Sequence, residues 1–309
     1  MTTTLSNMID EVSMNLSGYT LQQDRATYIT AAVTTTTSPS SAPTILTLAS
    51  ADNLGKGVVE IDEELLWIDN FDRVGNTATI APYGRGYLGT TAATHAADAK
   101  VTISPTFPRF AIKRAINDTI SAIGSSIFAA NTTTITSNAA VAAFRLPATG
   151  TTLNIRSILA VAYQALGASK EWIPIRTFRF DGNANTTAFT SGQTISIYDN
   201  IPSGRTIQVV YSTQPVPFTT NADVFTTQTG LPESCKDLVI LGATYRLLSN
   251  LDPARASMIS PQADEVDAKR PYGSSQSITK QIYALFNQRL NEEIKKQQDK
   301  YPIRVHYSL

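Results

Sequence analysis

A cluster of acidic residues is the first feature of the sequence that could carry out chemistry. Five carboxylates lie close together in the chain: Glu60, Asp62, Glu63, Glu64 and Asp69. Paired carboxylates can hydrolyse glycosides, and a group of them can bind a hard cation such as calcium. The cluster falls at a turn between two apolar strands, and it lacks the Asp-x-Asp-x-Asp-Gly pattern of a calcium loop. We interpret it as a solvated turn or a negative contact surface, with a hydrolase acting through these carboxylates as the alternative.

A glycine-rich segment has the three-glycine spacing of a dinucleotide-binding turn: Gly84-Arg85-Gly86-Tyr87-Leu88-Gly89. That motif needs a parallel strand before it, a helix after it and an acidic residue about twenty positions further on. Here Pro82 favours a hairpin, and the segment from Lys100 to Ile103 is typical of a strand. The glycines are therefore expected to shape a loop, and no cofactor is predicted.

The other candidates for catalysis are two histidines, His95 and His306, and the single cysteine, Cys235. Together they are too few for a structural zinc site. His95 could form a triad with Ser104 or Thr94, but the sequence has no Gly-x-Ser-x-Gly nucleophile elbow. Cys235 stands at the start of a helix, where a buried packing role is the ordinary one. The sequence thus predicts no catalytic residue and no metal ligand, and a protein that is not an enzyme.

The composition of the whole chain disfavours several classes of protein. Among 309 residues, 25 Lys and Arg balance 25 Asp and Glu, whereas a general nucleic-acid-binding protein would carry a basic excess. No signal peptide is recognisable, and the longest mostly apolar run, residues 158–168, is too short to span a bilayer. One cysteine cannot form an internal disulfide bond, which fits synthesis in a reducing cytoplasm. We expect no membrane partner.

Four amphipathic helices are predicted, because apolar residues recur at helical spacing in four segments of the chain. The four stripes are Leu5, Ile9, Val12 and Leu16; Ile112, Ile116, Ile120, Ile123 and Ile127; Leu238, Leu241, Tyr245 and Leu248; and Ile278, Ile282, Leu285, Phe286, Leu290 and Ile294. Each stripe needs a partner that buries it. A single helical bundle formed by residues 1–29, 105–129 and 229–300 would supply those partners.

Two strand-rich segments interrupt the helices. Short apolar runs bounded by turn residues predict strands at 45–48, 58–61, 65–68, 77–80 and 101–103, and later at 178–180, 194–198 and 206–212. We expect a first all-β insertion at 30–104 and a second at 130–228. The predicted fold class is therefore α+β: a discontinuous α-helical bundle with two inserted all-β modules and an extended C-terminal tail, residues 301–309.

The C-terminal tail alternates apolar and polar side chains after Pro302. The apolar side would carry Ile303, Val305 and Tyr307, and the polar side Arg304, His306 and Ser308. Such a segment could add a strand to an exposed sheet edge of another chain. A frayed terminus is the ordinary alternative.

Charge is segregated along the chain although the total is zero. Residues 52–72 are acidic, whereas residues 109–114 and the stretch from residue 276 onward are basic. These segments are expected to be solvated helix faces, or else complementary subunit faces. Opposite patches on one surface favour head-to-tail rings.

Three segments resemble the head–tail connector (adaptor) proteins of tailed bacteriophages. They are Ile61-Asp62-Glu63-Glu64-Leu65-Leu66-Trp67-Ile68, the glycine-rich loop continued through Thr90-Thr91-Ala92-Ala93-Thr94-His95, and Phe107-Pro108-Arg109-Phe110. The resemblance implies a non-enzymatic structural virion protein that forms a dodecameric ring under the portal. The ring would extend the DNA channel and provide the platform for tail attachment.

The resemblance also implies partners and a location. The partners are the portal protein, other copies of the chain, a downstream tail or neck protein, and double-stranded DNA that passes through the channel without sequence-specific binding. The location is the virion neck, between capsid and tail, after assembly in the cytoplasm of the bacterial host. Portal binding is assigned to tail residues Ile303, Arg304, Val305, His306, Tyr307 and Leu309.

A second hypothesis is a phage tail or baseplate protein that binds a receptor or carbohydrate. It is motivated by the Thr-rich β segments and requires exposed aromatic side chains on a β face. Trp67, Trp172 and Tyr198 are the candidates.

Overall fold

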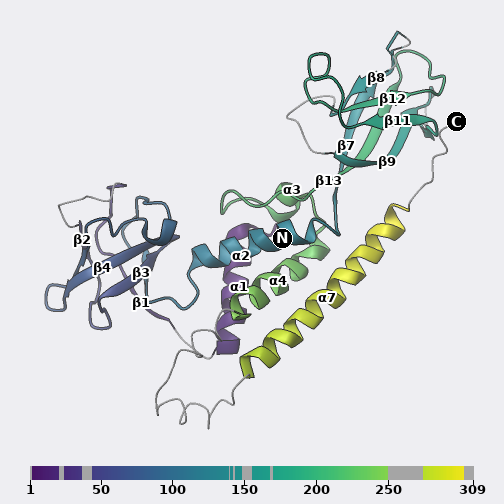
Figure 1. Ribbon diagram of the computed structural model, residues 1–309. Coiled ribbons are helices and arrows are strands. Elements are labelled where there is room, and N and C mark those ends of the chain that lie inside the picture. Colours follow the sequence, from purple (N-terminus) through teal and green to yellow (C-terminus); the bar gives the residue numbers. More distant parts are fainter. Residues whose placement is uncertain are drawn as a thin grey trace. The chain divides into compact units, whose positions relative to one another are not determined.

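The computed structural model describes residues 2–20, 24–36, 44–138, 140–141, 143–147, 155–167, 170–249 and 274–302 (Figure 1). These residues form two compact units. One unit comprises the described parts of Met1–Leu5, Asn117–Val239 and Ala284–Leu309. The other comprises the described parts of Ser6–Ile116 and Ile240–Tyr283.

The first two predicted helices are present. Helix α1 (Leu5–Thr20) buries its whole apolar stripe, and helix α2 (Arg109–Ile123) buries the isoleucine stripe that the spacing predicted. Ile127 lies beyond the end of α2 and is buried as well. The spacing of apolar residues therefore correctly predicted which face of each of these two helices is buried.

A six-stranded antiparallel sheet occupies what we call the N-terminal β region, residues 24–104. Its strands are β1 (Arg25–Tyr28), β2 (Thr44–Thr47), β3 (Gly57–Ile61), β4 (Glu64–Asp72), β5 (Thr77–Ile80) and β6 (Lys100–Ile103). Their order in the sheet is β1-β6-β3-β4-β5-β2. One apolar core of this region includes Ile29, Ile61, Leu66 and Ile80. Five of these strands match sequence predictions, and β1 was missed.

Two smaller antiparallel sheets make up the central β region, residues 129–213 (Figure 1). The strands are β7 (Ala129–Thr136), β8 (Ala143–Arg145), β9 (Ile155–Gln164), β10 (Trp172–Pro174), β11 (Phe178–Asp181), β12 (Thr194–Ile197) and β13 (Thr206–Thr213). Their orders are β10-β9-β13-β7 and β11-β12-β8. The two sheets share one apolar core that includes Leu146, Val161, Ile195 and Val209.

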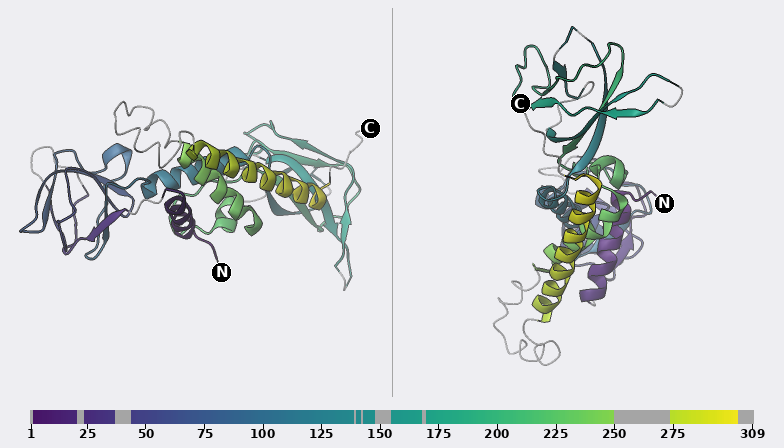
Figure 2. Two further views of the ribbon diagram at one scale, coloured as in Figure 1. Left: turned by 90° about the horizontal axis from the view of Figure 1, so that it is seen from below. Right: turned by 90° about the vertical axis from the view of Figure 1, so that its right-hand side faces the viewer.

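The remaining helices follow the central β region. They are α3 (Phe225–Thr229), α4 (Lys236–Ser249) and α7 (Ser274–Lys300), with short 3-10 turns at Tyr87–Gly89 (η1) and Glu233–Cys235 (η2). Helix α7 is one continuous rod of 27 residues (Figure 2). Its predicted stripe is partly wrong, because Phe286 is 7 % exposed whereas Leu285 is 52 % exposed. The buried face of α7 is thus narrower than the spacing of its apolar residues predicted.

The predicted fold class, an α-helical bundle with two inserted all-β modules, is wrong. The described residues contain 13 strands in three antiparallel sheets and only five α-helices. The boundary between the two compact units passes through α2, α4 and α7. An apolar stripe indicates that one face of a helix must be buried, but it does not indicate which helix or strand buries it. Strands β7, β8, β9 and β10 were not predicted individually, and of these only β7 is rich in threonine.

Candidate functional site

The acidic cluster lies on the β3–β4 hairpin, where Asp62 and Glu63 form a two-residue turn. The turn requires Asp62 to take a left-handed backbone conformation (φ 57°). Asp62 and Asp69 are exposed, as a solvated turn requires, but Glu60 and Glu64 are buried. The solvated interpretation is therefore wrong for these two carboxylates, and each needs internal partners.

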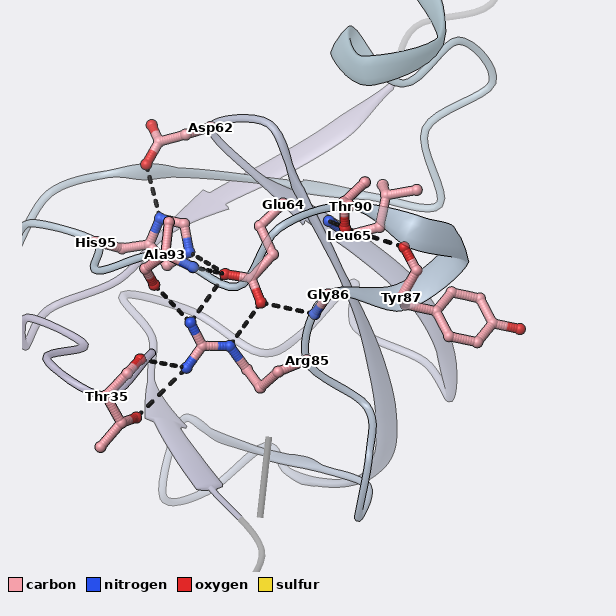
Figure 3. Close-up of polar contacts among 10 residues, drawn as sticks. All are labelled: Thr35, Asp62, Glu64, Leu65, Arg85, Gly86, Tyr87, Thr90, Ala93 and His95. Carbon is pink, nitrogen blue, oxygen red and sulfur yellow. Dashed lines mark hydrogen bonds and ion pairs between the residues drawn. The ribbon is translucent and has the colours of Figure 1, made fainter. Parts of the chain in front are cut away.

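Glu64 is the centre of a buried hydrogen-bonding network (Figure 3). Its carboxylate accepts hydrogen bonds from Arg85 Nε at 2.6 Å and Nη2 at 2.8 Å, and from the backbone N–H groups of Gly86 and Ala93, both at 2.9 Å. His95 Nε2 lies 2.8 Å from the same group. Burial alone would raise the pKa of Glu64, but the bonds from Arg85, His95 and the backbone outweigh it and lower that pKa to about 2.

The side chain of Arg85 has no solvent-exposed surface, and its remaining N–H groups donate hydrogen bonds to backbone carbonyls. Nη2 donates to the Ala93 carbonyl at 2.5 Å, and Nη1 donates to the Thr35 carbonyl at 2.9 Å. A bidentate Arg–carboxylate pair with every donor satisfied is the arrangement that best compensates for desolvation. Arg85 therefore joins three separate segments of the N-terminal β region.

His95 bridges two carboxylates. Its Nδ1 lies 2.7 Å from Asp62 Oδ2, and its Nε2 lies 2.8 Å from Glu64 Oε2. Burial lowers the pKa of His95, but the hydrogen bonds and charges of Glu64 and Asp62 raise it above its ordinary value. An imidazolium that donates from both nitrogens fits this geometry, and neither nitrogen is left to accept a proton from Ser104 or Thr94. The hypothetical triad is not formed.

The network holds the glycine-rich loop against β4. The carbonyl of Gly84 accepts a hydrogen bond from the N–H of Trp67 at 2.8 Å, and the N–H of Gly84 donates to Ala81 at the same distance. A Cβ at position 84 would lie 2.7 Å from the Ala81 carbonyl oxygen and 2.9 Å from that of Trp67. The loop glycine thus permits close backbone approach, which is the loop-shaping role predicted for these glycines.

Substituting alanine at this position tests that interpretation. Gly84→Ala is expected to destabilise the protein by about 1–3 kcal/mol, because two backbone oxygens would have to move apart. Gly55→Ala is the matched control, since a Cβ there meets nothing within 4 Å. Urea denaturation of both variants measures the difference, and equal stabilities would show that the close contacts at Gly84 are not a constraint.

The same loop presents apolar side chains to solvent on either side of buried Arg85. Tyr83 is 70 % exposed and Leu88 is 68 % exposed, and both have left-handed backbone conformations (φ 57° and 54°). Tyr87 packs its ring 5.3 Å from that of exposed Trp67, and it points away from the network (Figure 3). We call Trp67, Tyr83, Tyr87 and Leu88 the aromatic tip. Strained backbone that exposes large apolar groups indicates a contact surface.

Glu60 connects the β3 strand to the start of α2. Its carboxylate accepts a hydrogen bond of 2.5 Å from the backbone N–H of Arg109, the first residue of the helix. Nearby, Lys113 pairs with Glu63 at 3.1 Å, and Arg109 pairs with Asp10 of α1 at 2.6 Å. Burial raises the pKa of Glu60 to about 7 despite the favourable helix N-terminus.

Cys235 lies in η2, beside a pocket of about 410 Å³ whose other walls include Phe128, Glu293, Lys296 and Tyr301. Burial, with the adjacent Glu293 carboxylate, raises the pKa of the Cys235 thiol to about 12. A protonated, buried thiol is a poor nucleophile. The packing role predicted for Cys235 agrees with this geometry.

The remaining candidate residues lie either outside the described residues or on the surface. The tail residues assigned to portal binding, Ile303, Arg304, Val305, His306, Tyr307 and Leu309, lie outside the described residues, so that assignment stays a prediction. Trp67, Trp172 and Tyr198, named for carbohydrate binding, are all exposed.

No group of three His, Cys, Asp or Glu side chains in the described part of the chain is arranged to hold a metal ion. Within that part, no helix is both long and apolar enough to cross a membrane.

The pairing of Arg85 with Glu64 was not predicted from the sequence. One signal was available: a lone cation inside a glycine-rich turn, in a region where acids outnumber bases. The exposure of Tyr83 and Leu88 was also not predicted, because large side chains next to glycines in a loop can be either buried or exposed.

Comparison with known proteins adds independent information. The model of the family described as SU10 adaptor protein matches residues 88–306, which is well over half of the chain. A search of curated proteins finds no match.

Proposed function

Because this chain belongs to the SU10 adaptor protein family, we propose that it is a structural virion protein of a tailed bacteriophage, a head-to-tail adaptor without enzymatic activity. The observation that carries the proposal is the family match over residues 88–306. The motifs that resemble connectors span residues 61–110, so the two lines of support overlap only at residues 88–110. Half of the motif residues, those at 61–68 and 84–87, therefore lie outside the family match.

The chemistry of the described residues supports a structural role. The carboxylate, guanidinium and imidazole of the Glu64 network bond to one another and to the backbone, and the Cys235 thiol is protonated and buried. These groups stabilise a fold, and none of them is poised for proton transfer or nucleophilic attack. The exposed aromatic tip is better suited to contact with another protein.

The finer proposal is a dodecameric ring that docks under the portal, extends the DNA channel and serves as the platform for a tail or neck protein. The proposed location is the virion neck, after assembly in the bacterial cytoplasm. Balanced charge suits a DNA conduit, because many phosphate contacts would hold DNA that has to slide.

Mass photometry of the purified chain, alone and mixed with portal rings of the same phage, tests the proposal. Ring-sized particles, or a portal mass increased by a dodecamer of the chain, are expected. A monomer or trimer that leaves the portal mass unchanged, from a chain that is also absent from purified virions, would overturn it.

Deleting Ile303–Leu309 is expected to abolish docking to portal rings while leaving the fold intact. The truncation keeps Tyr301, whose ring lies 5.9 Å from that of Phe128, and Gln297, which bonds to the Phe128 backbone. Co-sedimentation with portal rings measures docking, and thermal unfolding monitors the fold.

Two further variants serve as a matched pair for this deletion. Replacing Ile303, Val305 and Tyr307 by serine should reproduce the loss, because it removes the apolar side of the tail. Ser308→Ala should dock as the full chain does. Unchanged sedimentation of the truncated chain would show that portal contact lies elsewhere.

A further inference from the structure

The two β regions carry opposite charge. The N-terminal β region, residues 24–104, has nine Asp and Glu against five Lys and Arg. The central β region, residues 129–213, has three Asp and Glu against six Lys and Arg. The formal charges of Asp, Glu, Lys and Arg are therefore −4 and +3, and the first becomes −3 when His95 is counted as the imidazolium that its two carboxylate partners favour. Surfaces of opposite sign on one chain favour association between copies.

The acidic region offers a rigid apolar contact. Within the aromatic tip, Tyr83 and Leu88 flank Arg85, whose bonds to Glu64, Thr35 and Ala93 fix the loop between them. Exposed Asp69 lies two residues beyond Trp67 on β4. Apolar groups held in one conformation lose little entropy on binding, and a carboxylate beside aromatic rings suits a cationic partner.

The basic region offers a complementary edge. Strands β10 and β11 are edge strands of the two sheets and are separated by only three residues of chain. Trp172 and Ile173 are 43 % and 39 % exposed, and exposed Glu171 precedes them. Exposed Lys170 lies two residues before Trp172, and exposed Arg179 lies on β11, six residues after Ile173. We call Lys170, Trp172, Ile173 and Arg179 the basic edge. Pro174 has no N–H and disfavours strand addition, so a partner would contact side chains.

We propose that the aromatic tip of one copy docks against the basic edge of the next copy. The inference rests on the proposed ring and names the contact that would build it. Because tip and edge are different surfaces, the contact is heterologous, and such a contact builds the proposed ring when the rotation between successive copies closes. Arg179 and Lys170 would lie over the rings of Trp67 and Tyr87 and near Asp69, while Leu88 packs against Ile173 or Trp172.

Disulfide cross-linking in assembled virions tests the contact. A chain with both Leu88→Cys and Ile173→Cys is expected to form a ladder of covalent oligomers under mild oxidation, and each single variant is expected to remain monomeric. Native Cys235 is buried and protonated, so it adds no background. Val74→Cys with Ile173→Cys is the matched control, because Val74 is 95 % exposed but lies at the β4–β5 turn, beyond the last residue of β4.

A charge-reversal pair gives a second measurement that does not depend on cysteine geometry. Lys170→Glu with Arg179→Glu is expected to reduce the amount of ring by at least about tenfold, because like charges would then face each other. Adding Asp69→Lys to that chain should restore part of the loss, whereas adding Lys56→Glu, an exposed change elsewhere in the same region, should not.

The outcomes separate this inference from the proposed function. If the double-cysteine chain is present in purified virions and stays monomeric, forms only an internal cross-link, or cross-links no more than the Val74 control, the contact is wrong and the adaptor function stands. If the unaltered chain is absent from virions, the adaptor function itself fails.

Discussion

Replacing Arg85 by methionine is expected to lower the free energy of unfolding by about 3–5 kcal/mol, because it leaves the buried Glu64 carboxylate without its bidentate partner. The backbone carbonyls of Thr35 and Ala93 would lose their donors as well. The aromatic tip should become mobile as a consequence, since Arg85 is the anchor between Tyr83 and Leu88.

Urea denaturation followed by Trp67 fluorescence measures this effect. The sequence contains two tryptophans, so a Trp172→Phe background assigns the signal to the N-terminal β region. Arg25→Met is the matched control, because Arg25 is exposed on edge strand β1 and should change stability by less than about 1 kcal/mol. A loss of similar size in both variants would show that the network contributes no more than an exposed arginine does.

Replacing Glu60 by glutamine is expected to stabilise the protein at pH 8 by up to about 3 kcal/mol and to change little at pH 4. The pKa of Glu60 is raised to about 7 from an ordinary value of 4.5, so folding favours its protonated form. The stability that this group contributes is fully present below the pKa of the unfolded chain and is lost as pH rises through about 7. Glutamine stays neutral and can still accept the hydrogen bond from the Arg109 N–H.

Paired urea titrations of the unaltered chain and Glu60→Gln from pH 4 to pH 9 measure this difference. Contributions from other groups, including His95, occur in both proteins and cancel when the two curves are subtracted. Asp69→Asn is the control, because Asp69 is exposed. A difference that does not vary with pH, or that favours the unaltered chain at pH 8, would contradict the assignment of Glu60 as a carboxyl protonated near neutrality.

Much of the local structure was predictable from residue spacing. The isoleucine stripe from Ile112 to Ile123 specified α2, and short apolar runs bounded by turn residues specified β3, β4 and β13. The two-residue turn at Asp62 and Glu63 followed from its place between two apolar runs. These predictions succeeded because helix and strand periodicities are set within a few residues.

The site was predictable only in part. The sequence directed attention to Glu60, Glu64, the glycine-rich loop and His95, but as separate features. Whether a carboxylate is solvated or buried depends on what packs over it, and Arg85 reaches Glu64 across 21 residues of chain. Spacing along a strand contains no information on such a partner.

The sequence by itself therefore determined the longer helices, the eight strands β2–β6 and β11–β13, and the family of protein that the chain resembles. The tertiary structure decided that Glu60 caps α2, that Glu64, Arg85 and His95 form one network, and that Phe286 is buried while its neighbour Leu285 is exposed. It also replaced the expected helical bundle with three sheets and two compact units. The physical reason is the same in each case, because periodicity is a local property, whereas burial and charge pairing depend on segments distant in sequence that come together only when the chain folds.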